Sequence, residues 1–475
     1  MPAQQYRRGD LPAAGRRGPR GLNATAANGP VGANAIAAGW AWLATLPRAA
    51  TAHAERGADP LAAVRALLCE LDNPHRDLRV IHIAGSKGKG STALYTERLL
   101  GALGLRTFTF TSPHLERWTE RLRLDGAEAM PERGFAALAA VRDASARSGI
   151  VPGFFEALTV AGLWLAAAER IDWCVIECGV GGRADATNIV EPAATIITGI
   201  ELEHVDRLGP RLSNIAREKA GIVKPGAPLI APRLAPELDS ILAARAHAAG
   251  TPFLRVEQEA EAASGPGVDD IVHWHHGPRG VSAAGPGWHV QTALAAPGAH
   301  MAGNAVLALA AIHALAPAPV ESLRRAADVL NGTALPGRME TVCERPWVIV
   351  DGAHTGASAT ALAAAIADLR AARLHLLLSC SSGKDLDAVL TPLLAVASAV
   401  TVTRADPTYS LPAGTLGGQV RAHKDTLAID VIEDLEAAVA RACADDPGRT
   451  LVLATGSVYL AGGVRALFNR EPSAG

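Results

Sequence analysis

A glycine-rich loop between an apolar run and a helical run is the feature that most constrains the fold. Residues 79–84 (RVIHIA) are mostly apolar or β-branched and stop at Gly85, which is typical of a buried strand. Residues 92–103 then have a helical pattern that ends at Gly104. A strand, a loop and a helix in this order indicate an α/β protein, in which helices flank a mainly parallel sheet.

The same alternation of strands and helices runs along most of the chain. Residues 255–300 interrupt it, because their glycines, prolines and short valine-containing runs favour hairpins or an irregular insertion. A second strand–helix series begins at Trp347. The other predicted elements are helices at 61–71, 156–169, 212–219, 302–315, 320–330 and 357–370, and strands at 172–178, 194–200, 374–380 and 451–457.

These patterns divide the chain into four segments. Residues 1–35 hold five arginines and one acidic residue among Gly, Pro and Ala, and we expect a disordered extension. A transit peptide is the alternative, but such peptides are rich in serine and this stretch has none. Residues 36–332 are predicted to form a larger α/β domain and residues 345–475 a smaller one. A linker is expected at 333–344, because the run NGTALPGR at 331–338 holds two glycines and a proline.

Composition excludes several classes of protein. With 475 residues, 49% hydrophobic and 19% charged, the chain is globular rather than disordered. A net charge of −2 gives no reason to expect a nucleic-acid partner. Six scattered cysteines without a CxxC pair support neither a disulfide scaffold nor a zinc site. The longest apolar stretch, 157–168, is too short to span a bilayer. We therefore expect a cytoplasmic protein without a membrane partner. We also expect it to be a monomer, although composition does not bear on this.

The loop GSKGKGS at 85–91 has the chemistry of a phosphate site. Its glycines let backbone N–H groups turn towards phosphate oxygens, and the following helix adds the positive end of its dipole. Lys89 would then meet the β- and γ-phosphates, and Ser91 would offer its hydroxyl to Mg²⁺. The loop departs from the usual P-loop pattern because Gly90 separates Lys89 from Ser91. The alternative is a glycine-rich turn that binds no ligand.

Lys219 is the most informative charged residue outside this loop. It shares a helical face with Leu212, Ile215 and Ala216, so we expect it to point inward, with Gly221 as the left-handed residue beyond the helix end. A desolvated lysine loses its charge readily, and its neutral amine can accept CO₂ to become an anionic carbamate. Extension of the amine to the surface, or a buried ion pair, fits the pattern equally well.

Four further features are ambiguous when taken alone. Glu156 stands at the start of an apolar helix, as an acid stabilised by the helix dipole or as a metal ligand. Ser112 has the position of a helix cap, and His204 follows a predicted strand, where a lone histidine is usually structural. The run GVGGRADATN at 179–188 also follows a strand, and its three glycines indicate a close backbone approach.

Together these segments resemble the Mur ligase superfamily and, within it, the folylpolyglutamate synthases and dihydrofolate synthases. Ten segments occur in the order of that family and span roughly residues 40–465. The resemblance implies an ATP-binding domain at 36–332 and a Rossmann-like domain at 345–475, with catalysis in the cleft between them. The segments are IHIAGSKGKGST, TSPHLERWTERLRLDG, FFEALT, ECGVGGRADATN, ITGIELEHVDRLG, IAREKAGIVKPG, GNAVLAL, LPGRME, DGAHTGAS and ATGSVYL.

The resemblance also assigns cofactors and residue roles. It implies ATP, two Mg²⁺ sites and a monovalent cation as cofactors. The residues assigned to ATP are Gly85, Ser86, Lys87, Gly88, Lys89, Gly90, Ser91, Asn304, Arg338 and Asp351. Those assigned to magnesium are Ser91, Ser112, Glu156 and His204, and those assigned to catalysis are Lys89, Glu156, His204, Lys219 as a carbamate, and His354.

The implied reaction joins L-glutamate to the carboxylate of a folate-type acceptor through an acyl phosphate, with release of ADP and phosphate. A Mur-type amino-acid ligase for a non-folate carboxylate is the alternative, since it would share every ATP residue. A silent nucleotide-binding module would lack some of the phosphate and metal residues, and all are present. Lys87, where bacterial bifunctional enzymes usually have Asn, and the AHTG run at 353–356 leave the pterin end of the acceptor open.

Overall fold

The computed structural model describes residues 33–47, 59–259, 269–277, 280–315, 320–446 and 448–469. The predicted extension lies outside these residues, except for its last three, which begin helix α1 (Ala33–Thr45). The chain divides into two compact units. The larger unit comprises the chain up to His114, with Trp118–Ala293 and Gly303–Leu330, and the smaller unit comprises Leu115–Arg117, Leu294–Ala302 and the chain from Asn331.

The larger unit is built on an eleven-stranded sheet. Its seven central strands, β9 to β2 in sheet order, pair in parallel, while antiparallel strands extend the sheet at both ends. In sheet order the strands are β11 (Trp288–Thr292), β10 (Gly280–Gly285), β9 (Asp270–Gly277), β8 (Phe253–Gln258), β7 (Leu229–Pro232), β6 (Pro192–Ile197), β1 (Val80–Ala84), β5 (Trp173–Glu177), β2 (Thr107–Phe110), β3 (Leu122–Leu124) and β4 (Ala127–Glu128).

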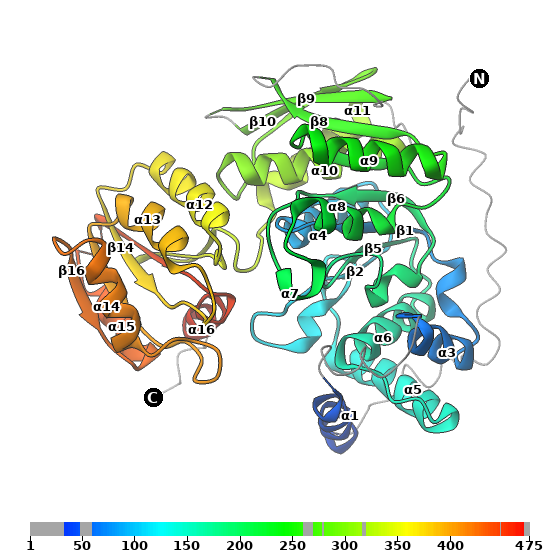
Figure 1. The fold of residues 1–475 in the computed structure, drawn as a ribbon, viewed down its shortest axis with the longest axis horizontal. Coiled ribbons are helices and arrows are strands. Elements are labelled where there is room, and N and C mark those ends of the chain that lie inside the picture. The colour runs from blue at the N-terminus through cyan, green and yellow to red at the C-terminus, as the bar shows by residue number, and fades with distance from the viewer. Residues whose placement is uncertain are drawn as a thin grey trace. The chain divides into compact units, whose positions relative to one another are not determined.

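Helices cover both faces of this sheet (Figure 1). Helix α4 (Lys89–Ala102) packs on β1, β2 and β5 from one side, and α6 (Phe154–Ala168) packs on the other. Gly162 lets α6 approach closely, because a Cβ there would lie 3.1 Å from the Phe108 ring. The remaining helices are α3 (Ala62–Glu70), α5 (Pro131–Ser148), α7 (Val205–Leu208), α8 (Leu212–Lys219), α9 (Pro236–Ala249), α10 (Ala299–Leu315) and α11 (Val320–Ala327).

The smaller unit contains a six-stranded sheet in which only β12 runs antiparallel to its neighbour. Helices α12 and α13 pack closely on one another, and α15 and α16 join the apolar core. In sheet order the strands are β12 (Glu340–Glu344), β13 (Trp347–Val350), β17 (Thr450–Thr455), β14 (Arg373–Leu378), β15 (Ala399–Val402) and β16 (Ala428–Val431). The helices are α12 (Gly356–Asp368), α13 (Leu386–Val396), α14 (Ala413–His423), α15 (Leu435–Cys443) and α16 (Val458–Phe468).

The expected α/β class is confirmed, and its parallel strands determine where polar residues gather. The carboxyl ends of parallel strands meet at one sheet edge, and the loops after β1, β2, β5 and β6 collect there. Residues 270–292 form hairpins as expected, but they extend the main sheet rather than standing apart from it. Within the described residues, no helix combines the length and apolarity needed to cross a bilayer.

Candidate active site

The loop after β1 is shaped by two glycines at which a side chain would clash with a neighbouring residue. Gly85 leaves the strand with φ +153°, and a Cβ there would lie 1.9 Å from Thr198 Oγ1. Gly88 has φ +83° in the left-handed region, and a Cβ there would lie 2.3 Å from Asn304 Oδ1. Asn304, far away in the sequence, is therefore packed directly against the loop. The glycines leave a cradle of backbone that a side chain would fill.

Helix α4 begins at this cradle with an open N-terminus. Its N-cap is Gly88, which supplies no side-chain acceptor, and the first helical bond runs from Thr92 N to Gly88 O at 2.9 Å. The N–H groups of the first turn consequently have no acceptor within the helix. Lys89 adds an ammonium group, whose Nζ donates to Gly85 O at 2.9 Å across the loop. Amide donors, a helix dipole and an ammonium are groups that attract a phosphate in proteins.

The segment after β6 holds the other side of the loop. Ser86 N donates to Gly199 O at 2.9 Å, and Ser86 Oγ accepts from Glu201 N at 2.9 Å and donates to Glu201 O at 3.2 Å. Thr198 Oγ1 donates to Lys87 O. The hydroxyl and the N–H of Ser86 are thus already used inside the protein, so Ser86 supports the loop and does not point its donors at a ligand.

Glu177, which the sequence analysis did not select, lies beside the first turn of α4. It ends β5, is 3% exposed, and its Oε2 accepts from Ser112 N at 2.8 Å. The same Oε2 would lie 3.5 Å from a Cβ on Gly90. One carboxylate thus joins the ends of β5 and β2 to the phosphate loop. The sequence feature that could have identified Glu177 is its position as an acidic residue directly after the apolar run WCVI at 173–176. This position is the carboxyl end of a parallel strand.

Glu156 has the contacts of a helix cap. It stands in the first turn of α6, 5% exposed, and its Oε2 accepts the N–H of the N-cap residue Gly153 at 2.6 Å. This is the first of the two roles considered for it, an acid at a helix N-terminus. Its role as a metal ligand stays a prediction.

His204 stands at the N-cap of α7, exposed and with φ +45°. A non-glycine residue in this left-handed region is uncommon, and such residues gather at functional sites. It follows the segment that anchors the phosphate loop, and it directly follows Glu203. The fold therefore places His204 at the same sheet edge as Ser112 and Glu177.

Lys219 is fully buried, which excludes extension to the surface. Its Nζ lies 2.6 Å from Glu203 Oε1, so the buried ion pair is the arrangement in this structure. Burial lowers the pKa of Lys219, and the positive charge of Lys89 lowers it further, against the attraction of Glu203. Burial alone would raise the pKa of Glu203, but Lys219 and Lys89 bring it below its usual value. Gly221 does not end the helix in a left-handed conformation as expected; the chain continues into a 3₁₀ turn, Ala220–Ile222.

The donor set around the loop fits a magnesium ion shared with a nucleotide. Among the described residues, no three His, Cys, Asp or Glu side chains come together as a metal cage. Mg²⁺ rarely uses such a cage, because it is bound through one or two carboxylates, phosphate oxygens and water. The buried hydroxyl of Ser91 and the Glu177 carboxylate supply oxygen donors of this kind.

Three predicted residues lie in the smaller unit, at the carboxyl end of β13. Asp351 is buried and accepts from Met339 N at 2.9 Å and from Ala353 N at 2.8 Å. Arg338 Nη1 donates to Gly337 O at 2.8 Å. His354 Nδ1 donates to Gly352 O at 2.8 Å, which makes Nε2 the basic nitrogen of the neutral ring.

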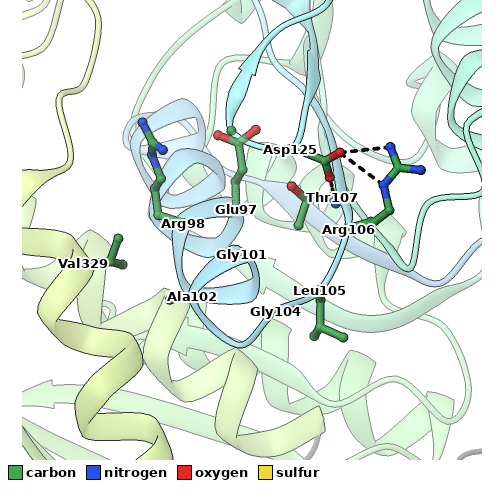
Figure 2. Close-up of a pocket in the computed structure, with 11 residues that line it drawn as sticks. Glu97, Arg98, Gly101, Ala102, Gly104, Leu105, Arg106, Thr107, Asp125 and Val329 are labelled. Atoms are coloured by element: carbon green, nitrogen blue, oxygen red, sulfur yellow. Dashed lines mark hydrogen bonds and ion pairs between the residues drawn. The ribbon is translucent and has the colours of Figure 1, made fainter.

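A groove of about 470 Å³ lies at the opposite end of the larger sheet (Figure 2). It is lined partly by Thr107, which starts β2, and β2 runs parallel to β1 through β5. Three of its charged residues are paired within the protein, since Arg106 Nη2 lies 2.9 Å from Asp125 Oδ2 and Glu97 bonds Arg123 at 3.1 Å. The groove is therefore separate from the phosphate loop.

Two family models match the chain. The Mur ligase middle domain matches residues 83–312, and the Mur ligase glutamate ligase domain matches residues 337–458. The dihydrofolate synthase/folylpolyglutamate synthase of Mycobacterium tuberculosis is 33% identical over 450 residues, which cover 87% of this chain and 91% of that protein. A probable bifunctional folylpolyglutamate synthase/dihydropteroate synthase of Halobacterium salinarum is 32% identical over 413 residues; the match covers 85% of this chain but only 49% of that longer relative.

Solved structures resemble the whole fold. The Mycobacterium tuberculosis folylpolyglutamate synthase complexed with ADP superposes with a TM-score of 0.78 at 30% identity, covering 93% of this chain and 99% of that chain. The bifunctional folylpolyglutamate synthase/dihydrofolate synthase of Yersinia pestis, complexed with AMPPNP and a Mn ion, gives a TM-score of 0.77 at 27% identity, covering 94% of this chain and 99% of that chain.

Proposed function

This chain belongs to the folylpolyglutamate synthase and dihydrofolate synthase family of Mur ligases, and we propose that it joins L-glutamate to a folate-type carboxylate at the expense of ATP. The observation that carries this proposal is the open N-terminus of α4, which brings amide donors and Lys89 to one cradle beside buried Glu177 and Lys219. Such a site suits a nucleotide triphosphate and the transfer of its terminal phosphoryl group.

A carboxylate must be activated before an amine can replace one of its oxygens. Transfer of the γ-phosphoryl group of ATP to the acceptor carboxylate gives an acyl phosphate and ADP. The α-amine of glutamate then attacks the carbonyl carbon, and the C–O bond to phosphate breaks to leave an amide. Lys89 and the first N–H groups of α4 would neutralise charge on the transferred oxygens. His354 is proposed to take the amine proton at Nε2.

We assign the magnesium site to Ser91, Ser112, Glu177 and His204. When bound, Mg²⁺ supplies charge neutralisation for the phosphates. Glu177 is preferred over Glu156 because its carboxylate contacts Ser112 and faces Gly90, whereas the Glu156 carboxylate bonds the start of its own helix. Four further expectations stay predictions: closure of the two domains, a linker at 333–344, the monomeric state and the cytoplasmic location.

Lys219 is proposed to act as a carbamate that replaces its ion pair with Glu203. Its burial and lowered pKa favour the neutral amine that reacts with CO₂. The test is Lys219→Ala with a short carboxylic acid added to the assay. We expect activity to be lost and then partly restored by the acid, and full activity without the acid would contradict the carbamate.

The overall proposal is tested with purified protein, ATP, labelled L-glutamate and either dihydropteroate or tetrahydrofolate. We expect ADP release and labelled amide with at least one acceptor. Absence of both products with both acceptors would refute the folate assignment. A screen of other carboxylates would then test the second candidate, a Mur-type ligase for a different acid.

A further inference from the structure

The carboxylate of Asp185 shapes the glycine-rich loop that follows β5. Its side chain is buried, and Oδ2 accepts from Gly179 N and from Val180 N, each at 3.0 Å. Oδ1 accepts from Thr187 N at 3.0 Å and from Thr187 Oγ1 at 2.5 Å. A loop with glycines at 179, 181 and 182 has few side chains to define its path. The four bonds to one carboxylate therefore determine the conformation of the loop.

A hydrogen-bonded chain connects this carboxylate to the strand that leads into the phosphate loop. Thr187 has one hydroxyl hydrogen, which goes to Asp185, so its oxygen accepts from His82 Nε2 at 2.9 Å. His82 is fully buried in the middle of β1, three residues before Gly85. The chain Asp185–Thr187–His82 thus joins the loop after β5 to the middle of β1.

The loop held by Asp185 packs on the backbone that carries Lys219. Arg183 N donates to Glu218 O at 2.8 Å. A Cβ on Gly182 would lie 2.6 Å from Glu218 O and 3.0 Å from Lys219 Cα. No side chain fits between the loop and the end of α8, so the loop supports the backbone that carries Lys219 by direct contact.

The phosphate loop has further anchors in the segment after β6, through Ser86 and Thr198. These anchors do not involve Asp185 or Thr187. We infer that Asp185 is a positioning residue that holds Lys219, through the loop at 179–183, in its place beside the phosphate loop. This inference rests on the proposed function, because it assigns Lys219 to the reacting site.

The test is Asp185→Asn, which keeps the shape of the side chain but replaces one acceptor oxygen by a donor. We expect kcat to fall about tenfold or more, while the Kd for ADP stays within about twofold of wild type. Thr187→Val, which cuts the link to His82, should give a smaller loss of the same kind. The control is Thr195→Val, because Thr195 is equally buried, is the register partner of His82, and its Oγ1 makes no hydrogen bond within the described part of the chain.

Hydrogen–deuterium exchange supplies a readout that does not depend on turnover. In Asp185→Asn and Thr187→Val, exchange should rise in peptides covering 179–188 and 212–219 and stay unchanged at 85–91. The inference is refuted if both variants keep wild-type kcat, if ADP affinity falls as much as kcat, or if exchange at 212–219 does not rise. Wild-type protein that makes no amide would refute the proposed function instead, while leaving the exchange result interpretable.

Discussion

The carboxyl edges of the two parallel sheets use their helix N-termini in opposite ways. In the smaller unit, four helices begin at a residue whose side chain accepts a hydrogen bond from an N–H of the first turn. In the fifth helix, α14, the N–H of Ala413 donates to Glu433 Oε2. In the larger unit α4 begins at Gly88 without such a bond, and α8 and α9 also lack one. The four capping residues of the smaller unit are Thr355, Asp385, Asp434 and Ser457.

Because of this difference, the capped helix starts stabilise their helices, whereas the uncapped start of α4 keeps its N–H groups available to bind an anion. A capping side chain satisfies amide donors of the first turn and stabilises the helix by about 1 kcal/mol. Leaving them open costs that stability but keeps the donors available for an anion. A helix that follows a parallel strand is thus a phosphate site only where its own sequence withholds the cap.

The largest effect is expected from removing the ammonium at the open helix start. Lys89→Ala should lower kcat about 10³-fold, because transition-state charge on the phosphoryl oxygens loses a direct partner. The matched control is Lys424→Ala in the smaller unit, since Lys424 Nζ also donates to a backbone carbonyl, Leu394 O, at 2.7 Å. If Lys424→Ala were as inactive as Lys89→Ala, the loss of activity would not be specific to the start of α4. The comparison of helix starts would then not locate the active site.

A second prediction separates Glu156 from Glu177, two of the buried acids of the larger unit. Glu177→Gln should lower kcat about 10²-fold at saturating ATP and Mg²⁺, because the phosphate loop loses its nearby carboxylate. Glu156→Gln should instead lower the unfolding free energy by about 1 kcal/mol, as the loss of a cap does. Steady-state kinetics and thermal melts of both variants measure this. If Glu156→Gln lost activity and Glu177→Gln lost only stability, the metal site would be assigned to Glu156 instead of Glu177.

The pH dependence of stability is expected to reflect His82. Burial lowers the pKa of His82 to about 3, so the folded chain keeps it neutral where the unfolded chain, with a pKa near 6.5, takes up a proton. The stabilisation that neutral His82 gives the folded chain is therefore fully present above pH 6.5. It is lost as the pH falls towards 3, and the unfolding free energy decreases by about 1.4 kcal/mol per pH unit. At pH 5 this amounts to about 2 kcal/mol.

The measurement is urea unfolding of wild type and His82→Gln between pH 7.5 and pH 5. The difference between their unfolding free energies isolates this histidine from the carboxylates that titrate in the same range. A difference that does not change with pH would show that the pKa of His82 is the same in the folded and the unfolded chain.

The smallest effect concerns the caps themselves. Asp434→Ala removes the cap of α15 and should cost about 1 kcal/mol of stability while leaving the Kd for ADP unchanged. Gly88→Ala should weaken ADP binding about tenfold, because its Cβ must displace Asn304 and its left-handed backbone becomes strained. Calorimetry of both variants distinguishes the two roles. Unchanged ADP binding in Gly88→Ala would contradict the proposed phosphate cradle.

Much of this arrangement was predictable because it depends on local patterns. The apolar run at 79–84 and the following glycines gave a strand, a turn and a helix, and the structure has them at β1 and α4. The inward face of α8 was also predictable, since the period of a helix places Lys219 beside Ile215. The Mur ligase family was recognised from motifs in a fixed order.

Other features depended on residues far apart in the chain. Glu177 stood at the end of an apolar strand, and only strand order brought its carboxylate to Ser112 and Gly90. Gly221 was expected to supply a left-handed turn, yet its small size is what matters, because a Cβ there would lie 2.5 Å from Arg183 Cβ. Residues 270–292 gave a hairpin pattern that did not indicate which sheet they would join.

The sequence by itself determined the fold class, the family and the chemistry of the phosphate loop, because periodicity and glycine spacing act over a few residues. Tertiary structure alone decided which acid faces the loop, whether Lys219 reaches solvent or Glu203, and how Asp185 connects β5 to β1. The physical reason is that hydrogen bonds and ion pairs between separate strands depend on sheet order and register, which a local pattern does not contain.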